Sequence, residues 1–274
     1  MALNPNIGWH PPTRTRQPAT GPQAQYRWPS EVRILSQNPT GYVNGILDYS
    51  LWWLICTAEY ARHFDADAYL AANADRVDAV VRALAAEAGD DGVLRPRPGP
   101  DAYDKPVFID WGVDVDPDRD ATALQALWFW ALTSARAVLD RAGHPGAGEW
   151  QQLAERLRET LRARAWDAQA GRWREYLDGA EASSPYPAVF ALLAGLTTGD
   201  AAAELGRWLL TVPETRTPFV TTFAVRALAE AGQAEAAVAQ VRRRWGRMLE
   251  LGATTYWEEF PDDCRDALYF LRMA

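Results

Sequence analysis

The feature that most restricts the fold is a series of long helical segments of two alternating kinds. Segment 44–63 is apolar on nearly all sides, and segment 121–142 carries a dense run of leucine, alanine and tryptophan. Helices of this composition are buried. Segments 149–165 and 234–251 are amphipathic and carry Arg-rich faces. The alternation predicts an all-α chain in which outer helices cover inner ones.

The remaining elements follow from periodicity and from the positions of glycine and proline. Further helices are expected at 66–87, 187–196, 199–210 and 218–231, with a short β-hairpin or tight turn at 166–173. Three glycines stand where helices should end: Gly195, Gly232 and Gly252. Short helical pieces are also expected at 31–36 and after Pro261, and we count about nine helices in all, since the shortest pieces are marginal.

Helix pairs joined by alternating short and long loops are typical of an α/α toroid. No internal repeat is strong enough to indicate a solenoid. Residues 1–37 are rich in Pro, Gly, Thr and Arg and lack periodicity, so we expect an irregular N-terminal segment. The toroid domain is expected to occupy residues 38–274.

Composition excludes several classes of function. The net charge of -8 and the absence of a basic block argue against a nucleic-acid partner. The two cysteines give neither a disulfide framework nor a zinc spacing, and no cofactor is indicated. The longest apolar run, near 51–56, is too short to span a membrane. Because the N-terminus lacks a signal-peptide pattern, a cytoplasmic protein is expected.

The long loop at 94–120 contains alternating aspartates, namely Asp114, Asp116, Asp118 and Asp120. The spacing resembles a calcium loop, but the glycine and the distal glutamate of that motif are missing. We therefore expect no metal here. Asp120 is predicted to cap the following helix, and the other three carboxylates are predicted to be solvated.

Three segments pair a carboxylate with tryptophan beside a predicted inner helix: 44–53, 107–111 and 252–261. The 13 tryptophans of the chain also indicate an aromatic-lined cavity. An indole can stack on the C–H face of a sugar while a carboxylate binds a hydroxyl or water. A toroid would collect the three segments on one rim, which predicts a carbohydrate site. The alternative is that the rings fill the core and the glutamates cap a helix.

Several motifs resemble the catalytic domain of bacterial α-L-rhamnosidases. They are DYSLWW, VFIDW followed by the ALQALWFWAL helix, TPFVTTFAVRALAEAG and GATTYWE, in the family's order over residues 31–260. Those enzymes are six-hairpin glycosidases with an (α/α)6 barrel. The resemblance therefore implies that fold, and a rhamnose-containing glycoside as the substrate.

The resemblance also implies roles for individual residues. The family hydrolyses terminal α-L-rhamnosides with inversion, which requires two carboxyl groups separated by room for a water. Glu258, in GATTYWE, falls on the general base. The positions that would line the rhamnose pocket are Asp48, Trp52, Trp53, Asp110, Trp111 and Trp257.

The sequence departs from the family in three respects. The general acid of the family lies upstream in a motif of the form D-G-x-x-R-D-R-x-x-W-x-G-D, whereas residues 13–18 bring no carboxylate. About nine helices fall short of the twelve in a closed barrel. The His-containing segment and β-sandwich that follow in the family are absent before Ala274. We therefore expect an incomplete barrel, shortened at both ends.

Two other readings remain open. One is a catalytically impaired or vestigial carbohydrate-binding protein on the same scaffold, because a missing general acid costs about 10²–10⁴ in rate. The other is a different toroid enzyme such as a terpene cyclase, although 114–120 matches its Asp-rich motif poorly. Apolar surface left by a missing hairpin would favour a homodimer that closes the barrel.

Overall fold

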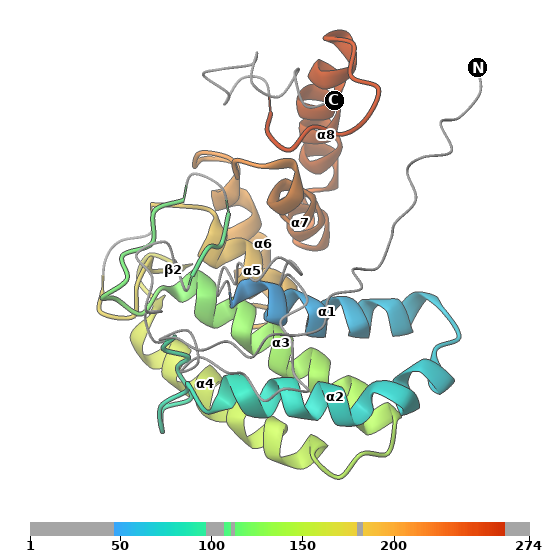
Figure 1. The fold of residues 1–274 in the computed structure, drawn as a ribbon. Coiled ribbons are helices and arrows are strands. Elements are labelled where there is room, and N and C mark those ends of the chain that lie inside the picture. The colour runs from blue at the N-terminus through green and yellow to red at the C-terminus, as the bar shows by residue number, and fades with distance from the viewer. Residues whose placement is uncertain (1–46, 97–106, 111–112, 180–182, 261–274) are drawn as a thin grey trace, which may run out of the picture.

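The computed structural model describes residues 47–96, 107–110, 113–179 and 183–260. In this part of the chain eight helices and one hairpin form the fold (Figure 1). The helices are α1 (Asp48–His63), α2 (Asp67–Ala85), α3 (Thr122–Arg141), α4 (Ala147–Arg164), α5 (Tyr186–Leu193), α6 (Gly199–Leu209), α7 (Pro218–Glu230) and α8 (Ala234–Glu250). The strands β1 (Trp166–Asp167) and β2 (Arg172–Trp173) pair antiparallel. The helical pieces predicted at 31–36 and after Pro261 lie outside the described residues.

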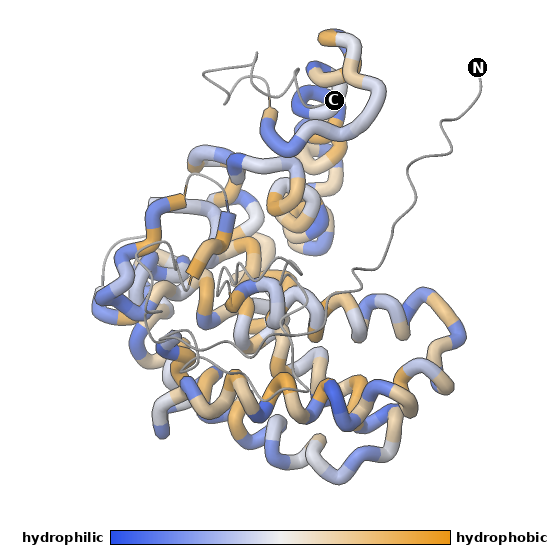
Figure 2. Tube along the Cα trace, in the orientation of Figure 1, coloured by the Kyte–Doolittle hydropathy of each residue, from blue (hydrophilic) through white to orange (hydrophobic). Residues whose placement is uncertain are grey.

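The helices form successive pairs, as expected for an α/α toroid. The inner helices α1, α3, α5 and α7 pack in sequence order, and α2, α4 and α8 lie against α3 or α7. Helix α3 has 15 of its 20 residues buried, so it must lie within the core. Hydrophobic residues gather where α3 and α5 cross the middle of the molecule (Figure 2). None of the described helices combines the length and the apolarity needed to cross a bilayer.

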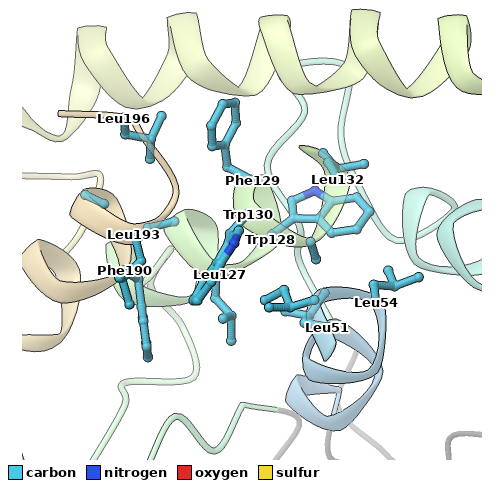
Figure 3. Close-up of a cluster of buried hydrophobic side chains, with 14 of the residues drawn as sticks. Leu51, Leu54, Leu127, Trp128, Phe129, Trp130, Leu132, Phe190, Leu193 and Leu196 are labelled. Atoms are coloured by element: carbon cyan, nitrogen blue, oxygen red, sulfur yellow. The ribbon is translucent and has the colours of Figure 1, made fainter. Parts of the chain in front are cut away.

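The centre of the core is built from the side chains of α3 and its two inner neighbours. Leu127 and Trp130 of α3 lie between Leu51 of α1 and Phe190 of α5, and Trp128 points to another side of α3 (Figure 3). These five side chains are each at most 6% exposed. Burying such groups contributes about 1.5–3 kcal/mol each, which is why the apolar helices take the inner positions.

Helix α1 is less completely buried than its sequence predicts. Tyr49, Cys56 and Tyr60 are exposed. They are seven and four residues apart, so they lie along one face of the helix. The described elements cover this face only in part: Tyr60 contacts Phe64 and Tyr69, and Tyr49 lies at the wall of a cavity.

The predicted capping role of Asp120 is wrong. Ala121 occupies the N-cap position of α3 and makes no side-chain cap, while the Asp120 carboxylate binds Arg95 at 2.9 Å. The amide of Thr122 donates instead to the carbonyl of Glu175, beyond the hairpin, at 2.9 Å. A backbone acceptor thus satisfies the helix start, which frees Asp120 for an ion pair.

Gly252 ends α8 and releases the chain into the last described loop. Its φ is 86°, a left-handed conformation that glycine adopts without strain. The amide of Gly252 donates to the Leu249 carbonyl and that of Ala253 to the Met248 carbonyl, both at 3.0 Å. This pattern is a Schellman C-cap. It turns residues 253–258 back toward the inner helices.

Candidate active site

Three segments far apart in the sequence line one cavity of about 1030 Å³. They are the first turns of α1, the loop at 107–110 and the loop at 253–258. The start of α7 and one face of α8 complete the wall. The structure thus brings together the three carboxylate–tryptophan segments that the sequence predicts at one rim.

Most of the predicted site residues line this cavity. Those that do are Asp48, Trp52, Asp110, Trp257 and Glu258. Trp53 does not: it is half-buried and packs against the hydrophobic core. Adjacent helical residues point about 100° apart, so Trp52 and Trp53 cannot share one wall. Trp111 lies outside the described residues.

Asp48 lies at the start of α1 with 2% of its surface exposed. Its carboxylate accepts hydrogen bonds from two successive amides, those of Phe108 at 2.8 Å and Ile109 at 3.4 Å. Burial raises the pKa of Asp48 to about 6, although these amides favour the charged form. Asp48 therefore connects helix α1 to the loop at 107–110.

Ile109 adopts a backbone conformation that is rare for its residue type. Its φ is 60°, in the left-handed region, and its side chain is buried. Positive φ is unfavourable for a β-branched residue. The amide of Asp110 donates to the carbonyl of Phe108 at 2.7 Å, so a γ-type turn encloses Ile109. The surrounding contacts must hold this turn in place.

Asp110 follows the strained turn and is 3% exposed. It accepts hydrogen bonds from the Tyr186 hydroxyl at 2.8 Å, from the Thr217 amide at 3.3 Å and from the Thr217 hydroxyl. Burial and the adjacent carboxylate raise the pKa of Tyr186 above its ordinary value, so its hydroxyl stays protonated. Thr217 also accepts from the Val220 amide as the N-cap of α7. Asp110 therefore joins its loop to the starts of α5 and α7.

An aromatic cluster lies beside these carboxylates. The ring of Trp52 stacks on Phe223 with centroids 4.4 Å apart and meets Phe219, Phe190 and Trp130 edge-on at 5.3–5.9 Å. These five rings come from the four inner helices. Such arrangements are the favoured geometries of aromatic pairs.

Phe219 is a cavity residue that sequence reasoning missed. It is 53% exposed and lines the cavity from the start of α7. The available signal was its spacing of four residues from Phe223 after Pro218, which puts both rings on one face of the helix.

The loop that carries Glu258 is anchored at its far end. Phe260 is 1% exposed, and its ring is covered by the Arg244 guanidinium at 3.8 Å and by Trp245 at 5.1 Å. Arg244 also binds the Glu214 carboxylate at 2.9 Å and the Arg216 carbonyl at 3.3 Å. One side chain of α8 therefore holds both this loop and the segment that leads to Thr217.

The three cavity carboxylates have different environments. Asp48 and Asp110 are buried and accept hydrogen bonds from protein donors, whereas Glu258 is exposed. Of these three, Glu258 is therefore the one placed to meet bulk water. Among the described residues, no three His, Cys, Asp or Glu side chains form a group that could hold a metal ion.

An α/α toroid whose rim combines indole rings with carboxylates around one cavity is typical of carbohydrate-active proteins. The family model for the bacterial α-L-rhamnosidase six-hairpin glycosidase domain matches residues 22–267. The chain therefore belongs to this family.

Two solved structures resemble the chain. The GH78 family rhamnosidase of Bacillus sp. GL1 is 26% identical with a TM-score of 0.70, over 81% of this chain and 24% of that one. The rhamnosidase from Klebsiella oxytoca with rhamnose bound is 26% identical with a TM-score of 0.66, over 79% of this chain and 41% of that one. The chain thus spans less than half the length of either rhamnosidase. No curated protein matches it.

Proposed function

We propose that the cavity binds the rhamnosyl group of an α-L-rhamnoside and that Glu258 is the general base for its hydrolysis with inversion. The observation that carries the proposal is the meeting of the segments around Asp48, Asp110 and Glu258 at one cavity. Membership of the rhamnosidase family supports the choice of sugar.

The proposed division of roles follows from exposure. Glu258 can reach a water molecule, and a general base must lie within hydrogen-bond reach of the proton that it removes. Trp257, which is half-buried, and Trp52 would supply the apolar surface for the sugar ring. Asp110 would act from the pocket wall, where α5 and α7 hold it.

The second candidate function is carbohydrate binding without turnover. It is favoured by the hydrogen bonds at Asp48 and Asp110, whose oxygens accept hydrogen bonds from protein groups instead of donating a proton to a leaving group. An inverting hydrolase also needs a general acid. In this reading the aromatic wall and Asp110 bind rhamnose, and hydrolysis is slow or absent.

Release of nitrophenol from an aryl α-L-rhamnopyranoside tests the hydrolase proposal. Glu258→Gln should lower the rate about 10²–10⁴-fold, because it removes a general base and keeps the shape of the side chain. Glu259→Gln is the matched control, since Glu259 does not line the cavity, and it should leave the rate unchanged. Equal rates in wild type and Glu258→Gln would exclude Glu258 as the base and favour the binding protein.

We also propose that the chain forms a homodimer and acts in the cytoplasm. Exposed aromatic side chains support self-association: Tyr60 stacks on Phe64 at 4.8 Å and meets Tyr69 at 5.2 Å, and all three are at least 40% exposed. Contiguous exposed apolar surface of this kind commonly marks an interface.

A further inference from the structure

We infer that Asp48 is a positioning residue, whose carboxylate holds residues 108–110 in their strained turn and so fixes Asp110 at the cavity wall. Its effect on rhamnoside binding rests on the function proposed above. Its effect on the turn does not.

The two hydrogen bonds to Asp48 have converging directions. The amides of Phe108 and Ile109 both point at the Asp48 carboxylate, at 2.8 and 3.4 Å. In an extended strand successive amides point to opposite sides. Their convergence on one acceptor is therefore specific to the turn.

The carboxylate of Asp48 and the turn that it contacts are buried together. Asp48 and Ile109 are each 2% exposed, so bulk water has little access to the carboxylate and to the Ile109 amide, whereas Phe108 is half-buried. A buried amide without an acceptor is strongly unfavourable. The left-handed conformation of Ile109 adds a further cost, since a β-branched side chain rarely tolerates it. Asp48 offsets both costs while the turn persists.

The turn also determines where Asp110 lies. Asp110 is the next residue after Ile109, and it must reach the Tyr186 hydroxyl and the Thr217 amide together. A change of φ at Ile109 would rotate the chain at the residue before Asp110. Hydrogen bonds from α1, α5 and α7 therefore meet in three consecutive residues of one loop.

Asp48 has a competing role that the test must separate. It is the acidic residue in the first turn of α1, where a negative charge favours the helix dipole. That role depends on α1 alone. It predicts the same effect of an Asp48 substitution whichever residue occupies position 109.

The experiment is a double-mutant cycle with Asp48→Asn and Ile109→Gly, measured by urea unfolding. Glycine adopts positive φ without strain, so the turn needs less support. Asp48→Asn should raise the equilibrium constant for unfolding in both backgrounds. The factor should be at least five times larger in the wild-type background than in the Ile109→Gly background. Ile109→Gly also removes packing, but the proteins with and without Asp48→Asn in that background lose it equally. This loss therefore cancels when the two are compared.

Amide hydrogen exchange gives a second reading. In Asp48→Asn and in Asp48→Ser, which is compatible with a helix start, the Phe108 amide should exchange at least tenfold faster than in wild type. The Leu70 amide, which donates to the Ala66 carbonyl at 2.8 Å in α2, is the control and should be unchanged.

Equal shifts in both backgrounds, with full protection of the Phe108 amide in the Asp48 variants, would overturn the inference. The chain could show coupling between Asp48 and Ile109 and faster exchange of the Phe108 amide, yet neither bind nor cleave rhamnosides. That result would support the inference about Asp48 and refute the proposed function. In a chain that binds rhamnose, Asp48→Asn should weaken binding at least fivefold.

Discussion

At the scale of single residues, three carboxylates on one cavity differ because their surroundings differ. Asp48 faces backbone amides, Asp110 faces a tyrosine and a threonine, and Glu258 is exposed. The motifs around all three could be recognised from the sequence. The direction of each carboxylate could not, because it depends on loops that reach the site from other parts of the chain.

Asp48 should give the stability of the folded chain a distinctive pH dependence. Its pKa is about 6 in the folded state against an ordinary 3.8, because burial disfavours the charged form. The folded state thus holds a proton that the unfolded chain releases near pH 4. This contribution is complete below pH 3.8 and is lost as pH rises through about 6.

The comparison of wild type with Asp48→Asn isolates this effect. From pH 7 to pH 5 the unfolding free energy of wild type, relative to the variant, should rise by roughly 1 kcal/mol. Urea unfolding at the two pH values measures the difference. A constant difference, or a fall on acidification, would show that the Asp48 pKa is not raised.

Trp257 and Trp53 offer a matched pair of tryptophans. Trp257→Ala should weaken rhamnose binding about tenfold, because it removes apolar wall from the cavity. Trp53→Ala should leave binding unchanged and lower stability, since Trp53 packs on the core instead. Calorimetric titration separates the two, and equal losses of affinity would contradict the assigned geometry.

At the scale of elements, all eight described helices lie close to their predicted limits because their apolar periodicity is strong. The hairpin at 166–173 is also confirmed, with Trp166 opposite Trp173. The start of α3 was predicted with the wrong cap. Its amide finds a carbonyl at Glu175, far along the chain, and no local pattern reveals such a partner.

Helix α8 controls the loop that carries Glu258. Arg244→Met should lower the unfolding free energy by about 1–3 kcal/mol and weaken rhamnose binding, because it removes the contact with the Phe260 ring and the bond to the Arg216 carbonyl. Arg243→Met is the control. Arg243 also pairs with Glu214, but its side chain is 59% exposed, so the loss should stay below about 1 kcal/mol.

Denaturation and titration of both arginine variants test this anchoring role. If Arg244→Met binds rhamnose as tightly as Arg243→Met does, the loop is held by other contacts.

At the scale of the whole molecule, aromatic rings join the inner helices where they meet at the cavity. Trp52 contacts rings of α3, α5 and α7. The toroid class could be predicted from the paired helices and their loops, and the inner positions of α1 and α3 could be predicted from composition, whereas those of α5 and α7 were not predicted. The meeting of α1 with α7 could not be predicted, because many arrangements of paired helices satisfy the same periodicity.

Self-association is a prediction for the whole molecule. Sedimentation at micromolar concentration should give about twice the chain mass of 30.5 kDa. Phe64→Asp should give the monomer, because it places a charge in the exposed aromatic cluster of Tyr60, Phe64 and Tyr69. A wild-type chain that sediments as a monomer would refute the dimer.

The central claim is that the cavity recognises rhamnose, and both the hydrolase and the binding-protein readings require it. Calorimetric titration with L-rhamnose tests it most directly, with L-fucose, a stereoisomeric 6-deoxy sugar, as the control. We predict one rhamnose site per chain, retained in Glu258→Gln, weakened by Trp257→Ala and not filled by fucose. Absence of rhamnose binding by the folded wild-type chain would contradict the account.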